Sequence, residues 1–159
     1  PRFCTALVRA AEACGAFDSH PSDPVPGREL SIAQISPRLF EMMQNDLGSR
    51  IWPKLQEQWG LIDYHGLNDA FVIKYEQGAQ EELRLHHDVA QVSGSIKLND
   101  EYTGAELEFP RQGYSNASLL IGSLLAWPSL VTHPHRSTPI TSGTKYSLTL
   151  WFELPLHIG

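Results

Sequence analysis

The stretch from His86 to Trp151 places two polar islands in sequence that otherwise alternates like short β-strands. The first island is Leu-His-His-Asp at positions 85–88, and the second is Thr-His-Pro-His at positions 132–135. Residues two apart in a strand point to the same side, so His86 and Asp88 should project together. A histidine from a distant strand would complete a 2-His-1-carboxylate face, which suits non-haem Fe(II) and leaves positions open for substrate and O₂.

A single lysine stands on the segment that follows the second island. It falls on one side of an alternating strand, together with small hydroxyl residues. One side carries Lys145, Ser147, Thr149 and Trp151, and the other carries Tyr146, Leu148, Leu150 and Phe152. Lysine is almost never fully buried without a partner, and no carboxylate is obvious on the neighbouring sequence. A bound dicarboxylate is therefore the simplest partner for an inward-facing Lys145.

From residue 69 onward the hydrophobic period changes from that of helices to that of strands. The candidate strands are separated by short linkers that contain glycine. They cover residues 70–75, 89–98, 106–109, 118–121, 124–127, 130–135 and 146–154. Helices followed by short strands predict a mainly β fold of the α+β class, a jelly-roll double sheet with the helices packed outside.

Helical patterns dominate the first 60 residues. Residues 2–17 carry apolar side chains at helical spacing, and this helix is expected to end at Gly15 and to brace a sheet. Residues 28–35 are interpreted as a short strand. A second helix is expected over residues 36–60, with its Ser-Pro pair as N-cap and first helical position and with a break or restart at Pro53.

Length and charge limit the number of domains and the kinds of partner that this chain is expected to have. A chain of 159 residues is expected to form one domain, with helical support over about 1–60 and a jelly-roll core over about 69–155. A net charge of −6 and a pI near 5.6 argue against a nucleic-acid partner, although they are compatible with a basic peptide substrate. No run of about 18 apolar residues is present, so no membrane partner or span is expected.

The ends of the sequence and its cysteines bear on localisation. No signal peptide is recognised, and residue 1 is proline, so we expect the natural N-terminus to lie upstream. Cys4 and Cys14 are interpreted as two free buried thiols, because on one helix they cannot meet. These features favour a cytoplasmic location.

The polar islands and Lys145 resemble the motif of the Fe(II)- and 2-oxoglutarate-dependent dioxygenases, in the branch that contains procollagen lysyl hydroxylases and prolyl 4-hydroxylases. That motif is His-x-Asp, then a distal histidine, then lysine or arginine about ten residues later; residues 86–88, His135 and Lys145 match it. Further similar stretches cover residues 3–17, 71–75, 98–99, 102–109 and 143–146. The resemblance implies a double-stranded β-helix (jelly-roll, cupin-like) with iron at its open mouth.

The resemblance also implies ligands for iron and for the cosubstrate. His86, Asp88 and His135 would hold Fe(II), and Lys145 would bind the distal carboxylate of 2-oxoglutarate. Tyr75 lies on a segment that would line the cosubstrate pocket, although a packed aromatic side chain is a second interpretation. Thr149 shares the side of Lys145 and is either a donor to the cosubstrate or an ordinary strand residue.

Two neighbouring histidines compete for the distal ligand position. Strand alternation alone does not separate His133 from His135. The resemblance selects His135, which stands ten residues before Lys145, and Pro134 would end the strand there because it has no N–H to donate. His133 is then expected to support a ligand histidine or to pack in the core.

The implied reaction converts 2-oxoglutarate to succinate and CO₂ and hydroxylates an unactivated C–H bond with O₂; ascorbate is the expected reductant. The presence of Asp88 favours hydroxylation, because halogenating relatives lack this carboxylate. Lysyl hydroxylases usually carry arginine where this chain has Lys145, a difference that concerns substrate subclass.

The substrate is left open between a Lys or Pro side chain in a peptide or protein and a free amino acid or small metabolite. A non-catalytic jelly-roll binding module is a further hypothesis. The sequence also leaves the oligomeric state open.

Overall fold

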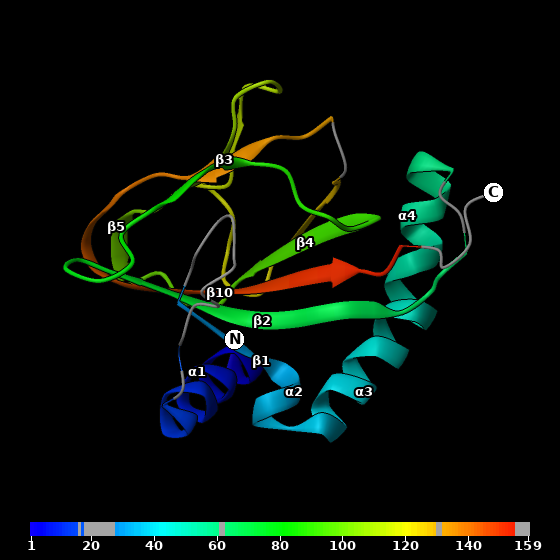
Figure 1. Cartoon of the computed structure of the whole chain (residues 1–159), viewed down its shortest axis with the longest axis horizontal. Helices are drawn as coiled ribbons and strands as arrows, with labels where there is room; N and C mark the ends of the chain where they lie inside the picture. The colour runs from blue at the N-terminus through cyan, green and yellow to red at the C-terminus, as the bar shows by residue number, and fades with distance from the viewer. Residues whose placement is uncertain (16, 18–27, 61–62, 130–131, 155–159) are drawn as a thin grey trace.

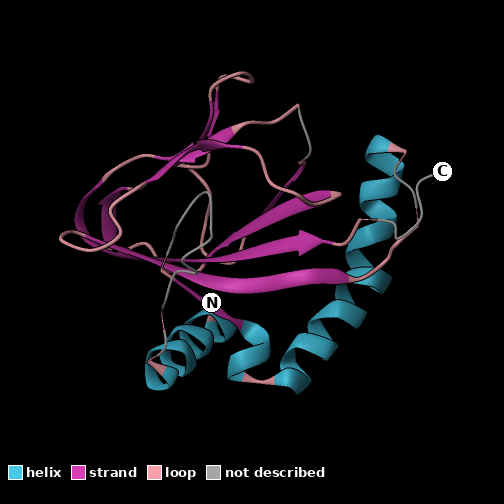
Figure 2. Cartoon of the chain, viewed as in Figure 1, coloured by secondary structure: helices cyan, strands magenta, loops and turns pink. Residues whose placement is uncertain are grey.

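The structure is a computed structural model that describes residues 1–15, 17, 28–60, 63–129 and 132–154. Two antiparallel sheets face each other, and helices cover the outer face of the larger one (Figures 1 and 2). The helical elements are α1 (Arg2–Cys14), α2 (Ile32–Ile35), α3 (Pro37–Asp46), a π-helical turn η1 (Leu47–Ile51) and α4 (Trp52–Trp59). This arrangement confirms the prediction of a mainly β jelly-roll with helices packed outside.

The larger sheet has six strands and the smaller sheet has four. The larger sheet runs in the order β1 (Glu29–Ser31), β2 (Leu67–Glu76), β10 (Ile140–Phe152), β4 (Val92–Lys97) and β8 (Leu124–Pro128), and β5 (Tyr102–Gly104) pairs with β10. The smaller sheet runs in the order β3 (Leu83–His86), β9 (His135–Ser137), β6 (Leu107–Phe109) and β7 (Tyr114–Ser115).

The central strand β10 separates an apolar layer from a pocket, as its alternation predicts. Leu148 and Leu150 are fully buried in the core between the larger sheet and the helices, where each such side chain contributes about 1.5–3 kcal/mol. The opposite face lies between the two sheets and lines a cavity through Lys145, Ser147, Thr149 and Trp151.

The helix boundaries follow local chemistry. Gly15 ends α1 in the left-handed conformation with φ 69°, which costs glycine no Cβ strain. The Ser36 side chain accepts a hydrogen bond from the Leu39 amide at 3.1 Å, and Pro37 stands at the start of α3. The predicted restart at Pro53 is confirmed, because a π-helical turn precedes it and α4 begins at Trp52.

Four predictions about strands and burial need correction. Cys4 is buried as expected, but Cys14 lies in the last turn of α1 and is exposed. Only Glu29–Ser31 of the predicted strand 28–35 is extended, because the Ser31 side chain caps α2. Residues 118–121 do not form a strand; hydrogen bonds from the Leu119 amide to Asn116 and from the Ser123 amide to Leu120 fold this apolar run into turns.

The fourth correction concerns residues 130–135. Within the described residues of this segment, 132–134 do not pair in a strand and the strand begins at His135; residues 130–131 lie outside the described part. Pro134 therefore precedes the strand and does not end it. No helix in the described residues is long and apolar enough to cross a membrane.

Candidate metal centre

Residues from both sheets line a cavity of about 270 Å³ between them. The smaller sheet and the turn after β3 contribute His86, Asp88 and His135, and the larger sheet contributes Tyr75, Lys145 and Thr149. These are the residues for which the sequence predicted metal and cosubstrate roles. Distant strands thus bring six predicted site residues into one pocket.

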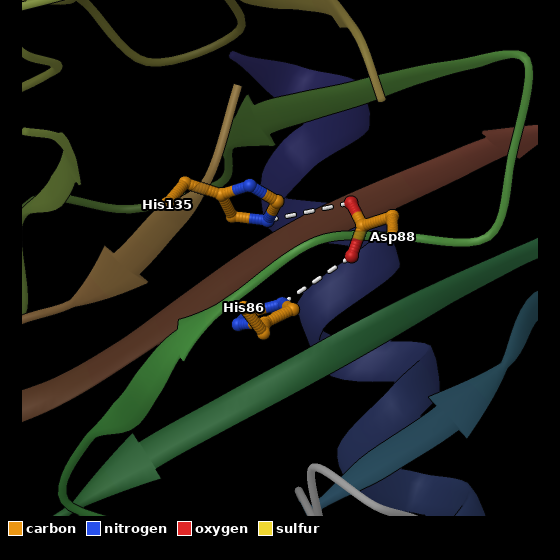
Figure 3. Close-up of side chains that lie close together, drawn as sticks. All are labelled: His86, Asp88 and His135. Carbon is orange, nitrogen blue, oxygen red and sulfur yellow. Dashed lines mark ion pairs between the residues drawn. The ribbon is translucent and has the colours of Figure 1, made fainter. Parts of the chain in front are cut away.

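His86, Asp88 and His135 converge on one point (Figure 3). One ligand atom from each lies within 4.8 Å of the other two. His86 Nε2 is 3.3 Å from one oxygen of Asp88, and His135 Nε2 is 3.3 Å from the other. The two histidines are cross-strand partners in β3 and β9, so the register of the smaller sheet brings them together.

The other nitrogen of each ring contacts a backbone carbonyl. His86 Nδ1 lies 2.6 Å from the carbonyl of Arg84, and His135 Nδ1 lies 3.1 Å from that of His133. A carbonyl can only accept, so Nδ1 carries a proton, and a ring without a second proton presents an Nε2 lone pair. Such contacts typically orient metal-binding histidines.

This donor set fits a divalent iron ion. Two Nε2 lone pairs and a carboxylate facing one another repel unless a metal ion or protons lie among them, and two histidines with one carboxylate form the facial set of non-haem Fe(II). Strand β3 ends at His86, so the turn after it, not regular alternation, brings Asp88 to the same side. The predicted convergence is correct, but its cause is different.

Asp88 is held in its ionised form. Burial alone would raise the pKa of this carboxyl, but hydrogen bonds from His135 and His86, in the form in which each ring carries a proton on Nε2, and from Ser93 hold it well below its usual range. Ser93 donates to Asp88 at 2.7 Å, and the Ser129 hydroxyl lies 2.8 Å from Ser93. Ser93 has only one proton, so Ser129 must donate to it.

The predicted cosubstrate residues form one wall of the pocket. Lys145 is 4% exposed and donates to the Ala105 carbonyl at 2.5 Å. Its ammonium lies 5.3 Å from the ring centre of Tyr75, its cross-strand partner, and 5.7 Å from that of Tyr102. Among the described residues, no carboxylate forms an ion pair with Lys145. A buried cation held by one carbonyl and two aromatic rings is poised to accept an anion.

Burial is the main cause of the pKa shifts of Lys145 and Tyr75, the two ionisable groups on this wall. Burial, followed by the nearby Lys97 ammonium, lowers the pKa of Lys145 to about 8. Burial also raises the pKa of the Tyr75 hydroxyl, which keeps it a neutral hydrogen-bond donor near neutral pH.

His133 does not face the pocket as a regular strand would require. Its Nδ1 lies 2.6 Å from the Thr132 hydroxyl, and its contact with His135 is through the backbone carbonyl. Burial, with Arg111 and His135, lowers the pKa of His133. The support that the sequence predicted from its side chain therefore comes from its main chain.

Sequence reasoning missed several residues of the site. Trp127 and Glu29 line the pocket, and Ser93 and Ser129 form the hydrogen-bonded chain behind Asp88. Trp127 packs edge-on against His135 with ring centres 4.9 Å apart. Serine, tryptophan and an edge-strand glutamate are common outside functional sites, so the sequence does not identify these residues until the sheets are paired.

Comparison with known proteins agrees with the iron-binding geometry of this site. Residues 70–153, more than half of the 159-residue chain, match the family described as the 2OG-Fe(II) oxygenase superfamily. A multifunctional procollagen lysine hydroxylase and glycosyltransferase of Caenorhabditis elegans is 28% identical over 160 residues, which cover 91% of this chain and 22% of that protein. A procollagen lysyl hydroxylase and glycosyltransferase of Acanthamoeba polyphaga mimivirus is 39% identical over 92 residues, which cover 52% of this chain and 10% of that protein. The chain thus spans about a tenth to a fifth of the length of these relatives.

The fold has a counterpart among solved structures. The viral collagen prolyl hydroxylase of Paramecium bursaria Chlorella virus-1, solved as a 2OG complex, aligns with a TM-score of 0.65 at 17% identity, covering 96% of this chain and 89% of that one. This likeness confirms the predicted double-stranded β-helix. Together with the family match over residues 70–153, it leads to one conclusion: the chain belongs to the 2OG-Fe(II) oxygenase superfamily.

Proposed function

We propose that this chain is an Fe(II)- and 2-oxoglutarate-dependent hydroxylase that acts on a Lys or Pro side chain of a peptide or protein. The observation that carries the proposal is one pocket that holds both a 2-His-1-carboxylate set and a buried, anion-seeking Lys145. A jelly-roll binding module without chemistry has no need for either feature.

The two walls of the pocket have different proposed roles, metal binding and cosubstrate binding. His86, Asp88 and His135 would hold Fe(II), which supplies O₂ reduction coupled to conversion of 2-oxoglutarate to succinate and CO₂ and to hydroxylation of a C–H bond. Lys145 would pair with the distal carboxylate of 2-oxoglutarate. Tyr75, Lys145 and Thr149 lie on paired strands of one sheet, so the donors and the cation keep fixed spacing.

Two aromatic side chains exclude water from this chemistry. Phe109 and Trp127 pack against the ring of His135, which is 4% exposed. Their apolar surface lowers the local dielectric, which strengthens the attraction between charged ligands and the site.

The names of the relatives support the proposed substrate class. The similar proteins in Caenorhabditis elegans and mimivirus are named as procollagen lysine or lysyl hydroxylases, and the similar viral structure is a collagen prolyl hydroxylase. We therefore favour a Lys or Pro side chain in a peptide, with ascorbate as the reductant that keeps iron divalent. A free amino acid or small metabolite is the second candidate substrate.

The test is turnover by the purified chain with Fe(II), 2-oxoglutarate, ascorbate and O₂. Succinate formation reports the cosubstrate reaction, and mass spectrometry of peptides and free amino acids reports a gain of one oxygen atom. We expect succinate from the chain and none from His135→Ala. A folded chain that forms no succinate under these conditions would favour the binding module.

A further inference from the structure

We propose that Asn99 positions Lys145 for the distal carboxylate of 2-oxoglutarate, because its side-chain amide holds the main chain on both sides of that lysine. This inference rests on the proposed function and deepens it. Asn99 does not line the cavity, so it would act through Lys145 and not by touching the cosubstrate.

The strand that carries Lys145 changes partners at this residue. On one side, β10 pairs with β2 without interruption over residues 144–151. On the other side, β4 pairs with residues 147–151, and β5 pairs within residues 140–143. Residues 144–146 therefore lie in a gap between two partner strands, where their main-chain groups need other hydrogen-bond partners.

The Asn99 side chain fills this gap. Its Nδ2 donates to the carbonyl of Thr144 at 2.7 Å, and its Oδ1 accepts from the amide of Tyr146 at 2.8 Å. In a strand, the carbonyl of one residue and the amide two residues later point to the same side. A side-chain amide has a donor end and an acceptor end on one planar group, so it can bond to both.

The register of β4 and β10 explains why Asn99 stands opposite Lys145. Ser147 is paired with Lys97 in the ladder, so continuing each strand by two residues brings Lys145 opposite Asn99. The strand β4 ends at Lys97 and the chain then turns away to form β5. The side chain of Asn99 thus supplies the bonds that the main chain of a longer β4 would make.

The segment that begins at Asn99 also reaches the ammonium of Lys145. The Ala105 carbonyl accepts from that ammonium, and the Tyr102 ring lies close to it. The same segment packs on the main chain of Gly143, whose φ of 76° and missing Cβ allow the close approach. The lysine is therefore held at its main chain and at its charged end by one stretch of the chain.

A lysine held in this way is preorganised for an anion. Ordering a long lysine side chain costs conformational entropy, and here the cost falls on folding and not on cosubstrate binding. A displacement of about 1 Å in a site can reduce its activity about 100-fold. Loss of the Asn99 bonds should therefore weaken the pairing of Lys145 with a carboxylate, while the metal set on the smaller sheet and its turn is left in place.

The test compares 2-oxoglutarate with 2-oxopentanoate, which has the same carbon chain and chelating end but a methyl group in place of the distal carboxylate. Both are titrated into the Mn(II)-loaded chain, and the ratio of the two Kd values reports the distal carboxylate alone. Asn99→Ala should raise the Kd of 2-oxoglutarate about 10- to 100-fold and that of 2-oxopentanoate by less than about threefold. General damage to the fold or to the metal set would weaken both ligands alike.

Further variants show whether Asn99 acts through Lys145. In Lys145→Met the ratio should already be lost, so adding Asn99→Ala should not change it further. Asn99→Gln keeps both hydrogen-bonding groups on a longer stem and should retain part of the ratio. Gln91→Ala is the matched control, because Gln91 Nε2 donates to the Glu153 carbonyl at 3.1 Å and joins the other ends of β4 and β10. This control should keep the wild-type ratio.

Three results would overturn the inference. They are an unchanged ratio in folded Asn99→Ala, an equal change of the ratio in Gln91→Ala, and equal affinity of the wild type for the two ligands. If urea unfolding shows that Asn99→Ala does not fold, Asn99→Ser replaces it with the same expectation, since serine can satisfy only one of the two main-chain groups. The titrations need no turnover, so a ratio that depends on Asn99 in a chain that forms no succinate with Fe(II) would reject the proposed function and still support this positioning role.

Discussion

Replacing Lys145 by methionine keeps a side chain of similar length and removes its charge. In the free protein, burial and the nearby Lys97 lower the pKa of Lys145 from 10.5 to about 8, which corresponds to about 3 kcal/mol against the charged form. Methionine removes that cost but leaves the Ala105 carbonyl without its donor at 2.5 Å, a loss of about 1–3 kcal/mol. These effects oppose each other, so the free energy of unfolding near pH 7 should change by less than about 2 kcal/mol.

Binding of 2-oxoglutarate should respond very differently. Removing one partner of a buried charge pair costs about 3–5 kcal/mol, which raises the Kd by roughly 150- to 5,000-fold. Titration of the Mn(II)-loaded protein with 2-oxoglutarate measures this change, and urea unfolding measures stability. Lys145→Arg should be milder than Lys145→Met, because it keeps a cation that can pair with a carboxylate.

Lys97→Met is the matched control. Lys97 lies 5.7 Å from the ring centre of Tyr102, which Lys145 also contacts, but it does not line the pocket. Its loss should change the Kd of 2-oxoglutarate by less than about fivefold, the size of a partly exposed charge interaction. If Lys145→Met kept the wild-type Kd, or if it unfolded the protein while Lys97→Met lost the cosubstrate, the assignment of the anion site would be refuted.

Three further predictions test the same pocket. Because the pKa of Lys145 is about 8 in the free protein and a bound anion would raise it, affinity for 2-oxoglutarate should be nearly constant below pH 8 and fall by up to about tenfold per unit above it; Lys145→Arg should lack this dependence. His135→Ala should abolish metal-dependent succinate formation, whereas His133→Ala should reduce it by at most about 10–100-fold, because the contact with His135 is through the backbone. Ser93→Ala should weaken Mn(II) binding by about 10–100-fold, and unchanged Mn(II) affinity by paramagnetic resonance would contradict the role given to the Ser93–Asp88 hydrogen bond.

Most of the fold could be predicted from local patterns. Strand β10 alternates strictly because one side packs under the helices and the other lines a pocket, so period 2 identified both faces. The Ser-Pro start of α3 and the glycine after α1 could also be predicted, because capping depends on neighbouring residues only.

The prediction failed where tertiary contacts override local pattern. The apolar run at 118–121 resembles a strand, but Leu120 is 78% exposed and turn hydrogen bonds replace a ladder. Residues 132–134 also looked extended, yet β9 starts only at His135, where cross-strand pairing with His86 begins. Strand ends depend on the partner strand, which a single sequence does not identify.

The residues of the site likewise fall into those that the sequence predicted and those that it did not. The ionisable residues of the metal set and Lys145 were predictable because histidine, aspartate and buried lysine are costly unless they have partners. Ser93 and Ser129 were not, because serine is common on β-strands and surfaces alike. Glu29 was missed because an edge strand normally carries charged residues to prevent aggregation, and only its register with Ile73 and Ser147 separates it from such residues.

The two walls of the pocket differ in how firmly their residues are held. Tyr75 and Lys145 lie on long paired strands, β2 and β10, whose register is continuous from Thr144 to Trp151. The metal set comes from a strand of four residues, a strand of three residues and a turn. The hydrogen bond from Ser93, on β4 of the larger sheet, to Asp88 ties that turn to the firmer wall. This link helps to fix the distance between the metal and cosubstrate residues, so its loss should disturb the alignment of the two groups as well as metal binding.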